Sequence, residues 1–222
     1  MGALIKSSIL RKVVMALSGL FLVLFLALHV TINFTSVFSP DLFNELSHFM
    51  GYNPVVQFLM QPILILGVIL HFVLGIGLEL QNSRARSVNY VKFKGGANAS
   101  WVSRNMIISG LVILAFLGLH FYDFWIHEIT FKYVEASPED PTRYYEETVQ
   151  KFIPMWRTVI YVIAFFLLGM HLWHGFSSSL QSMGWNNKYT ASVKAFTKLY
   201  ALIVPAGFII IALYHHFNHL SQ

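Results

Sequence analysis

Residues 18–29 read SGLFLVLFLALH, and residues 109–120 repeat the same motif as SGLVILAFLGLH. Each copy lies late in a long apolar run and ends in a single histidine. A second echo, H-x-x-x-G, begins at His71 and again at His171, each inside another apolar run. The chain therefore carries four histidines in two matched pairs, and these are the features that its fold has to explain.

The composition indicates a membrane protein. Of the 222 residues, 56% are hydrophobic and only 11% are charged, whereas soluble domains carry roughly a quarter charged residues. Crossing a hydrocarbon core about 30 Å thick takes about 20 apolar residues. The sequence predicts an all-α integral membrane protein with one domain over residues 1–222. Five transmembrane helices are expected at about 13–33, 55–79, 105–126, 157–178 and 198–219.

The distribution of charge predicts the orientation. The net charge is +5, but most of the basic residues lie in the segments expected on one side of the membrane. The charge therefore does not indicate nucleic-acid binding. With the N-terminus inside, the outer loops hold only four of the fifteen basic residues, namely Lys132, Arg143, Lys151 and Arg157. Because inner loops carry the excess of Lys and Arg, we expect a cytoplasmic N-terminus and an external C-terminus. The first apolar run is expected to be a retained helix, since no small-residue cleavage motif follows it.

The absence of cysteine narrows the chemistry. The chain has no cysteine, which excludes disulfides, a thioether-attached haem and an iron–sulfur cluster ligated by this chain. Histidine is left as the main candidate metal ligand.

Helix depth decides how the four histidines pair. At 1.5 Å per residue, His29 and His120 both lie about 24 Å from the inner ends of their helices. The helices of His71 and His171 run the other way, which places these two near the inner side. We therefore expect His29 to pair with His120 and His71 with His171, on two levels roughly 15–20 Å apart.

Small and polar neighbours accompany each pair. Ser18 and Ser109 precede the histidine of their own helix by eleven residues, or three turns, so they share its face. Gly75 and Gly175 follow their histidines by four residues and clear space for a flat macrocycle. Ionisable side chains at this depth are costly and usually functional. Neutral imidazole is a common haem ligand, and two imidazoles leave no open position on the iron, which suits electron transfer.

The remaining histidines are expected to have other roles. His174 lies one turn from His171 and is interpreted as a neighbour or hydrogen-bond donor. The others are expected at interfacial or solvated positions: His215, His216 and His219 at the outer end of the fifth helix, and His48 and His127 in outer loops.

Together these motifs resemble a known family. S-G-x8-L-H in the first helix, H-x-x-x-G in the second and fourth, and R-x4-S-G-x8-L-H from Arg104 to His120 resemble the two-haem cytochrome b subunit of succinate:quinone oxidoreductases. The likeness is to the five-helix, single-polypeptide membrane anchor of succinate dehydrogenase and fumarate reductase, and it covers nearly the whole chain.

The resemblance implies a set of ligands and partners. His71 and His171 would bind a proximal haem b near the cytoplasm, and His29 and His120 a distal haem b near the outer side. A flavoprotein subunit and an iron–sulfur subunit would dock on the cytoplasmic face of a bacterial inner membrane, and the succinate site would lie on the flavoprotein. Electrons would pass from the iron–sulfur subunit through both haems to a quinone, most often menaquinone. The direction, succinate oxidation or fumarate reduction, stays open.

Quinone and propionate contacts are less defined. Some family members place a glutamate two residues before the fourth-helix ligand, where this chain has Gly169. The acids nearest the distal level are Asp41, Glu45, Asp123 and Glu128, each interpreted as a proton relay or a solvated loop acid. Arg11, Arg104 and Arg157 lie at helix ends, where they would reach haem propionates or snorkel to the interface.

Two other functions were weighed. His171 with His174, and the trio His215, His216 and His219, resemble the histidine boxes of membrane di-iron oxygenases. The predicted topology places these boxes on opposite sides of the membrane, and a third box is missing. A proton-coupled transporter would show inverted repeats and mid-depth acids, whereas the echoes here join helices of the same direction.

Overall fold

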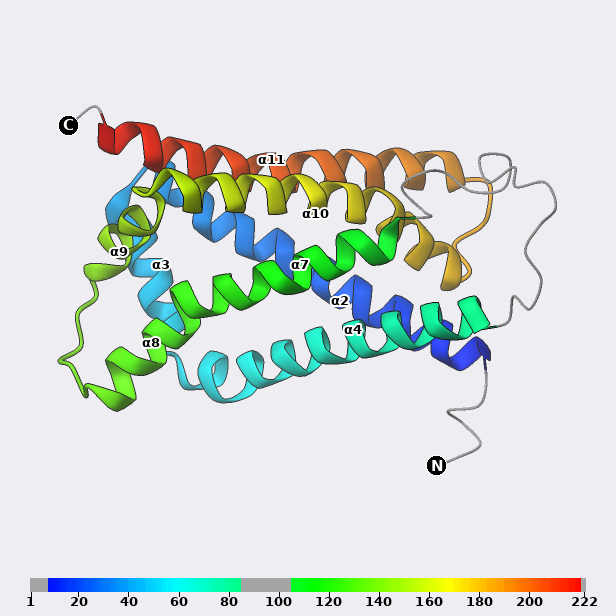
Figure 1. The fold of residues 1–222 in the computed structure, drawn as a ribbon, viewed down its shortest axis with the longest axis horizontal. Coiled ribbons are helices and arrows are strands. Elements are labelled where there is room, and N and C mark those ends of the chain that lie inside the picture. Colours follow the sequence, from blue (N-terminus) through cyan, green and yellow to red (C-terminus); the bar gives the residue numbers. More distant parts are fainter. Residues whose placement is uncertain (1–7, 85–104, 221–222) are drawn as a thin grey trace.

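The computed structural model describes residues 8–84 and 105–220. Within them, five helical stretches are long and apolar enough to cross a membrane. Their main helices are α2 (Ser8–Phe34), α4 (Gln61–Arg84), α7 (Met106–His120), α10 (Met155–Ser182) and α11 (Thr190–Leu220). Successive helices run in opposite directions along the long axis of the bundle (Figure 1). The predicted all-α bundle with five membrane-spanning helices is thus confirmed, while the side that faces the cytoplasm stays a prediction.

Each span is longer than its predicted apolar run. α2 begins at Ser8, about five residues before the predicted start of the first helix at about 13. α11 begins at Thr190 instead of about 198, because the preceding turn is closed by polar bonds such as Asn187 N–H to Thr190 Oγ1 at 2.9 Å. Hydropathy marks only the apolar part of a helix, whereas backbone hydrogen bonding continues until a turn or a proline stops it.

The third span departs most from its predicted end at 126. α7 continues without a break through η3 (Phe121–Ile126), α8 (His127–Ile129) and η4 (Thr130–Val134). The prediction that His127 and Glu128 lie in an outer loop is therefore wrong. η3 and η4 are π-helical, a geometry that is rare and frequent at functional sites.

Two shorter helices occupy the predicted loops 34–54 and 127–156. α3 (Pro40–Tyr52) begins with proline at its first position, and Ser39 Oγ accepts a hydrogen bond from Leu42 N–H at 3.2 Å. α9 (Arg143–Phe152) follows a turn in which Asp140 Oδ1 accepts a hydrogen bond from Thr142 N–H at 2.8 Å. Both helices lie at the same end of the bundle, next to α8 (Figure 1). They close one end of the membrane domain and are called the cap below.

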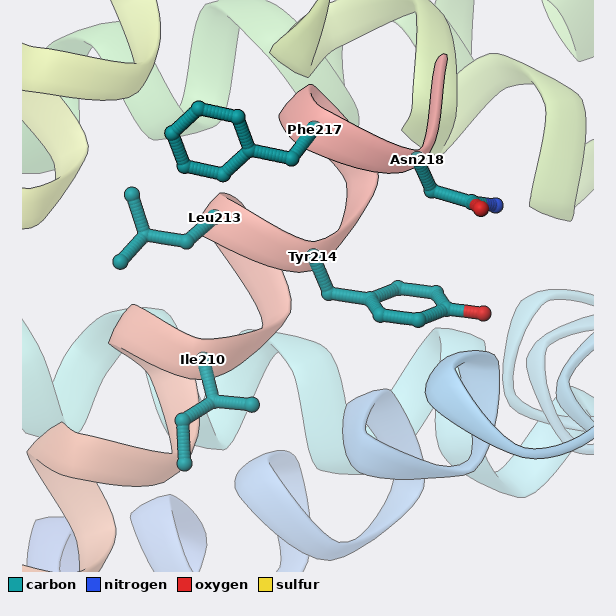
Figure 2. A pocket seen from close by; sticks show the side chains of 5 residues that line it. All are labelled: Ile210, Leu213, Tyr214, Phe217 and Asn218. Carbon is teal, nitrogen blue, oxygen red and sulfur yellow. The ribbon is translucent and has the colours of Figure 1, made fainter. Parts of the chain in front are cut away.

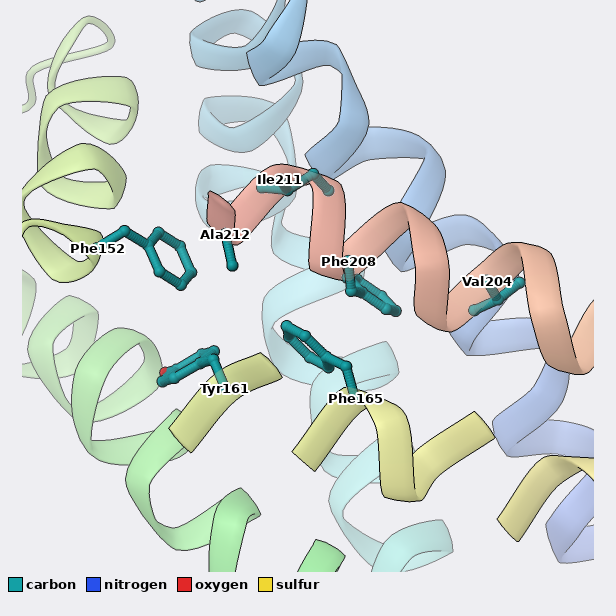
Figure 3. Packing of buried hydrophobic residues seen from close by; sticks show 7 residues of the cluster. All are labelled: Phe152, Tyr161, Phe165, Val204, Phe208, Ile211 and Ala212. Atoms are coloured by element: carbon teal, nitrogen blue, oxygen red, sulfur yellow. The ribbon is translucent and has the colours of Figure 1, made fainter. Parts of the chain in front are cut away.

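The core is concentrated on one side of the bundle. α10 packs closely along α11, and an aromatic cluster joins these helices to the end of α9 (Figure 3). Its buried members are Phe152, Tyr161, Phe165, Val204, Phe208, Ile211 and Ala212. In contrast, none of the described side chains of α4 is buried. The uneven packing leaves internal space between α4 and the other helices.

Proline acts differently in two spans. The five-residue π segment η2 (Val56–Met60) directly precedes α4, whose second residue is Pro62. A proline ring clashes with the carbonyl four residues earlier, and a π turn is one way to accommodate it. The π segment therefore lies where the ring of Pro62 meets the preceding turn. Pro205 lies inside α11, which continues past it to Leu220.

Candidate functional site: paired histidines in a membrane cavity

A cavity of about 590 Å³ runs through the bundle. It is lined by side chains from all five spans and by two residues of α9, and most of the lining is apolar. All four histidines singled out in the sequence line it: His29, His71, His120 and His171. The volume lies in the range of about 300–1,000 Å³ that is usual for ligand sites. The cavity is therefore the candidate functional site.

The histidines face one another in the two expected pairs. The ring centroids of His29 and His120 are 5.7 Å apart, with planes at 86°. Those of His71 and His171 are 6.3 Å apart, with planes at 75°. A metal bond to imidazole nitrogen is about 2.0–2.1 Å long, so two rings on opposite sides of one ion have centroids about 6 Å apart. Both pairs have the spacing that such ligation requires.

The donor set limits which group fits. Among the described residues, no cluster of three or more His, Cys, Asp or Glu side chains is placed to hold a metal ion. Protein-bound zinc and non-haem iron usually need three or four protein ligands. A haem supplies four in-plane nitrogens itself and asks the protein only for axial ligands. Each facing pair of histidines therefore offers the two imidazole nitrogens that a haem can take from a protein.

Aromatic side chains surround the pair His29–His120. Phe25 stacks on His29 with centroids 5.1 Å apart, and Phe116 stacks on His120 at 5.9 Å. Phe208 of the core cluster lies 5.5 Å from His29. These rings pack around the two imidazoles and restrict the orientation of their planes.

The repeated Ser-Gly pairs contact the other two histidines. Ser18 Oγ lies 3.2 Å from His71 Nδ1, and Ser109 Oγ lies 3.3 Å from His171 Nδ1. The sequence grouped each serine with the histidine of its own helix, which is eleven residues later. The structure instead brings it against the histidine of another helix, because that histidine is at the same depth.

A polar chain leads away from His29. Asn33 Nδ2 lies 3.3 Å from His29 Nδ1 and donates to the His29 carbonyl at 2.8 Å. Ser36 Oγ donates to the Asn33 carbonyl at 2.7 Å and lies 2.9 Å from His215 Nε2. His215 and His216 are both buried, which excludes a solvated position, one of the two expected for them. His219 is exposed.

Asp123 is the acid at the level of His120. Its side chain is 0% exposed, and Tyr161 Oη donates to its Oδ2 at 2.8 Å. Arg157 Nε lies 3.4 Å from the same oxygen. Tyr161 also lines the cavity, and its ring centroid is 6.3 Å from that of His120. A solvated role, one of the two expected for Asp123, is excluded by this burial.

The other acids belong to the cap. Asp41 and Glu45 are exposed on α3. Glu128 pairs with Lys132 and Arg143, and Arg143 Nη1 also donates to Glu147 at 2.8 Å. Burial opposes the charge of Arg143, but its hydrogen bonds to the two glutamates outweigh burial and raise the pKa of the guanidinium above its ordinary value. This network joins the extension of α7 to α9.

The cap also holds the two outer histidines. His48 pairs with Glu139 at 2.9 Å, and His127 Nε2 lies 3.4 Å from Glu147. Both therefore take part in surface ion pairs. His174 lies on α10 one turn beyond His171 and is half-buried. Within the described chain, the histidine-box residues do not converge on one metal site.

Gly169 has a packing reason. A Cβ built there would lie 3.2 Å from the carbonyl oxygen of Ala201 and 3.4 Å from Cγ of Pro205. The position faces the contact between α10 and α11, so a glutamate side chain does not fit without separating these helices.

The cations expected at haem propionates fall in different places. Arg157 pairs with Asp123, Arg11 Nε is buried with no hydrogen-bond partner among the described residues, and Arg104 lies outside the described residues. Sequence reasoning missed Lys12, which lines the cavity near its end at Ser182 and Asn82. Its position next to Arg11 on a helix end was the available signal.

A second hollow lies on the surface of α11. Five residues of its last turns line it, and all come from one helix (Figure 2). Such a helix face lacks the second wall that encloses a ligand, so it does not compete with the internal cavity.

The fold and the cavity define a multi-pass, all-α membrane protein with two facing pairs of internal histidines. No family model, curated protein or solved structure was found to match the chain. Its function is therefore argued from its own residues.

Proposed function

We propose that this chain is the cytochrome b membrane anchor of a succinate:quinone oxidoreductase. In this proposal His71 and His171 hold a proximal haem b, and His29 and His120 hold a distal haem b. One observation carries the proposal: the histidines face each other in two pairs within a single apolar cavity. The ring centroids are 5.7 Å apart in one pair and 6.3 Å apart in the other, and the bundle around them has five helices long and apolar enough to cross a membrane.

The ligand set favours electron transfer over oxygen chemistry. A haem held by His71 and His171, or by His29 and His120, would supply a one-electron redox centre. The chain's own residues hold the imidazoles in pairs and surround those of the outer pair with phenylalanine rings. The apolar lining excludes water from the space between the pairs.

The partners follow from what the chain lacks. With no cysteine, it ligates no iron–sulfur cluster, so the cluster that exchanges electrons with it lies on a separate subunit, with a flavoprotein behind it. On the far side, the electron acceptor or donor is a quinone, with menaquinone as the favoured class. Running in the opposite direction, the same arrangement serves fumarate reduction, which is the alternative function.

A haem count tests the proposal directly. The purified chain should give a dithionite-reduced-minus-oxidised spectrum of b-type haem and two haems per chain by pyridine haemochrome. His71→Ala and His29→Ala should each lower the count toward one, whereas His219→Ala, at an exposed position, should leave it at two. A chain that binds no haem but retains iron or zinc would refute the proposal and favour a histidine-box enzyme.

A further inference from the structure

Each Ser-Gly pair of the repeated motif contacts the imidazole of a different helix in the same way. Ser18 Oγ lies 3.2 Å from His71 Nδ1, and Ser109 Oγ lies 3.3 Å from His171 Nδ1. The two contacts are equivalent, although they join different helices: α2 with α4 in one case, α7 with α10 in the other. A repeated contact of this kind calls for a shared role.

The serine hydrogens are already engaged. Ser18 Oγ donates to the carbonyl of Met15 at 2.9 Å, and Ser109 Oγ donates to the carbonyl of Met106 at 2.9 Å. A hydroxyl has one hydrogen and two acceptor lone pairs. Toward the imidazole each oxygen therefore accepts, so the hydrogen-bond network assigns a proton to Nδ1 of both rings. In a neutral imidazole the lone pair is then on Nε2.

The glycines complete the two seats. A Cβ at Gly19 would lie 3.4 Å from Cε1 of His71, and one at Gly110 would lie 3.6 Å from Cε1 of His171. Ser-Gly thus touches the Nδ1–Cε1 edge of each ring: serine binds the nitrogen and glycine leaves room beside it.

From this geometry we infer that Ser18 and Ser109 are positioning residues, which hold His71 and His171 as Nδ1-protonated imidazoles with Nε2 turned to one shared iron. The inference rests on the proposed function. It also makes the two levels unequal. At the other level, His29 Nδ1 lies 3.3 Å from the Asn33 amide, and His120 Nδ1 is buried without a hydrogen-bond partner among the described residues.

The inequality has a redox consequence. An acceptor on the outer N–H of a metal-bound histidine fixes its tautomer and raises its basicity as a ligand. A more basic ligand favours the oxidised metal, so removing the serine hydroxyl should raise the midpoint potential of the centre held by His71 and His171. The other centre should not move.

Redox titration of the purified chain, with haem counting and low-temperature spectra, tests the inference. Ser18→Ala and Ser109→Ala should each shift one potential upward, both should shift the same one, and the double variant should shift it further. Ser18→Thr retains the hydroxyl and should restore the wild-type value. Ser83→Ala is the matched control, because Ser83 Oγ likewise donates to a carbonyl of its own helix, that of Leu80 at 3.0 Å, but it is exposed and does not line the cavity.

The outcomes separate the two proposals. A wild-type chain without haem defeats the proposed function itself. Two haems in the wild type, with unchanged potentials in the serine variants, overturn the inference alone. An equal shift in Ser83→Ala does so too, as does a shift of the centre that His29→Ala removes. Selective loss of the centre at His71 and His171 in an alanine variant, reversed by threonine, supports it. If Ser18→Ala fails to accumulate, Ser109→Ala breaks the equivalent bond and decides.

Discussion

The hydrogen bond from Tyr161 to Asp123 offers a direct measure of how firmly the outer level of the cavity is built. Tyr161→Phe removes only the hydroxyl that donates to Asp123 Oδ2 at 2.8 Å. The two side chains are 1% and 0% exposed, so water does not replace the lost donor. Arg157 Nε, at 3.4 Å, is then the remaining partner of that oxygen.

Two ranges are available for the free energy that this hydrogen bond contributes. Hydrogen bonds between membrane helices contribute on average about 0.6 kcal/mol, whereas hydrogen bonds to ionised groups contribute about 1.5–3 kcal/mol. The larger range applies because Asp123 is paired with Arg157 and its Oδ1 already lacks a partner among the described residues. We expect Tyr161→Phe to lower the free energy of unfolding by about 2 kcal/mol. That is more than a tenfold change in the unfolding equilibrium, since about 1.4 kcal/mol is tenfold.

Reversible unfolding of the purified chain in mixed micelles measures this cost. Tyr122→Phe is the control, because Tyr122 lies in the same π segment but is 63% exposed, and it should change stability little. In an Asp123→Asn background the bond becomes neutral, so the cost of Tyr161→Phe should fall by about 1 kcal/mol. A cost near 0.6 kcal/mol, or the same cost in both backgrounds, would refute the reasoning.

Three further predictions concern the cap and the helix contacts. Arg143→Gln should lower the free energy of unfolding by about 2 kcal/mol, a value between those typical of exposed and of buried ion pairs. The reason is that the Arg143 side chain is 6% exposed and bridges two glutamates. A decrease below about 0.5 kcal/mol would contradict this prediction. Burial and the nearby negative charge of a glutamate raise the pKa of Tyr144 above 10.0, so the folded state holds this proton more tightly. Stability should then fall as pH rises above about 10, and Tyr144→Phe should flatten that part of the curve; identical alkaline profiles would argue against it. Gly169→Val should cost about 1–3 kcal/mol by overpacking against α11, whereas Gly118→Ala, with nothing within 4 Å of the added carbon, should be neutral; equal costs would exclude the packing explanation.

The sequence predicted the spans and the depth of the histidines because both depend only on distance along a helix. A rise of 1.5 Å per residue fixes height, and equal height is enough to pair His29 with His120 and His71 with His171. It does not fix the rotation of one helix against another. The contact of Ser18 with His71 depends on that rotation and was therefore not predictable from spacing within α2.

The burial of polar residues was the second feature that the sequence could not predict. Asp123 stands among aromatic residues near a predicted helix end, where either a solvated or a buried carboxyl is plausible from sequence. Its burial depends on the continuation of α7 through η3 to Val134 and on Tyr161 from α10. The cap helix α9 was not predicted for a related reason. It is rich in charged residues and has no apolar run, so its hydropathy is that of a loop.

The adjacent histidines of α11 show why a histidine-rich sequence motif alone does not identify a metal site. Successive helical residues point about 100° apart, so His215 and His216 face different neighbours. Ser36 Oγ gives its hydrogen to Asn33, so it accepts from His215 Nε2 at 2.9 Å, while His216 Nδ1 donates to the Phe152 carbonyl at 2.9 Å. Each ring thus joins α11 to a different element: His215 to the 3₁₀ helix η1 (Thr35–Val37), which follows α2, and His216 to the end of α9. The cavity histidines differ because each faces a second imidazole, whereas His215 and His216 each bind a hydroxyl or a carbonyl oxygen.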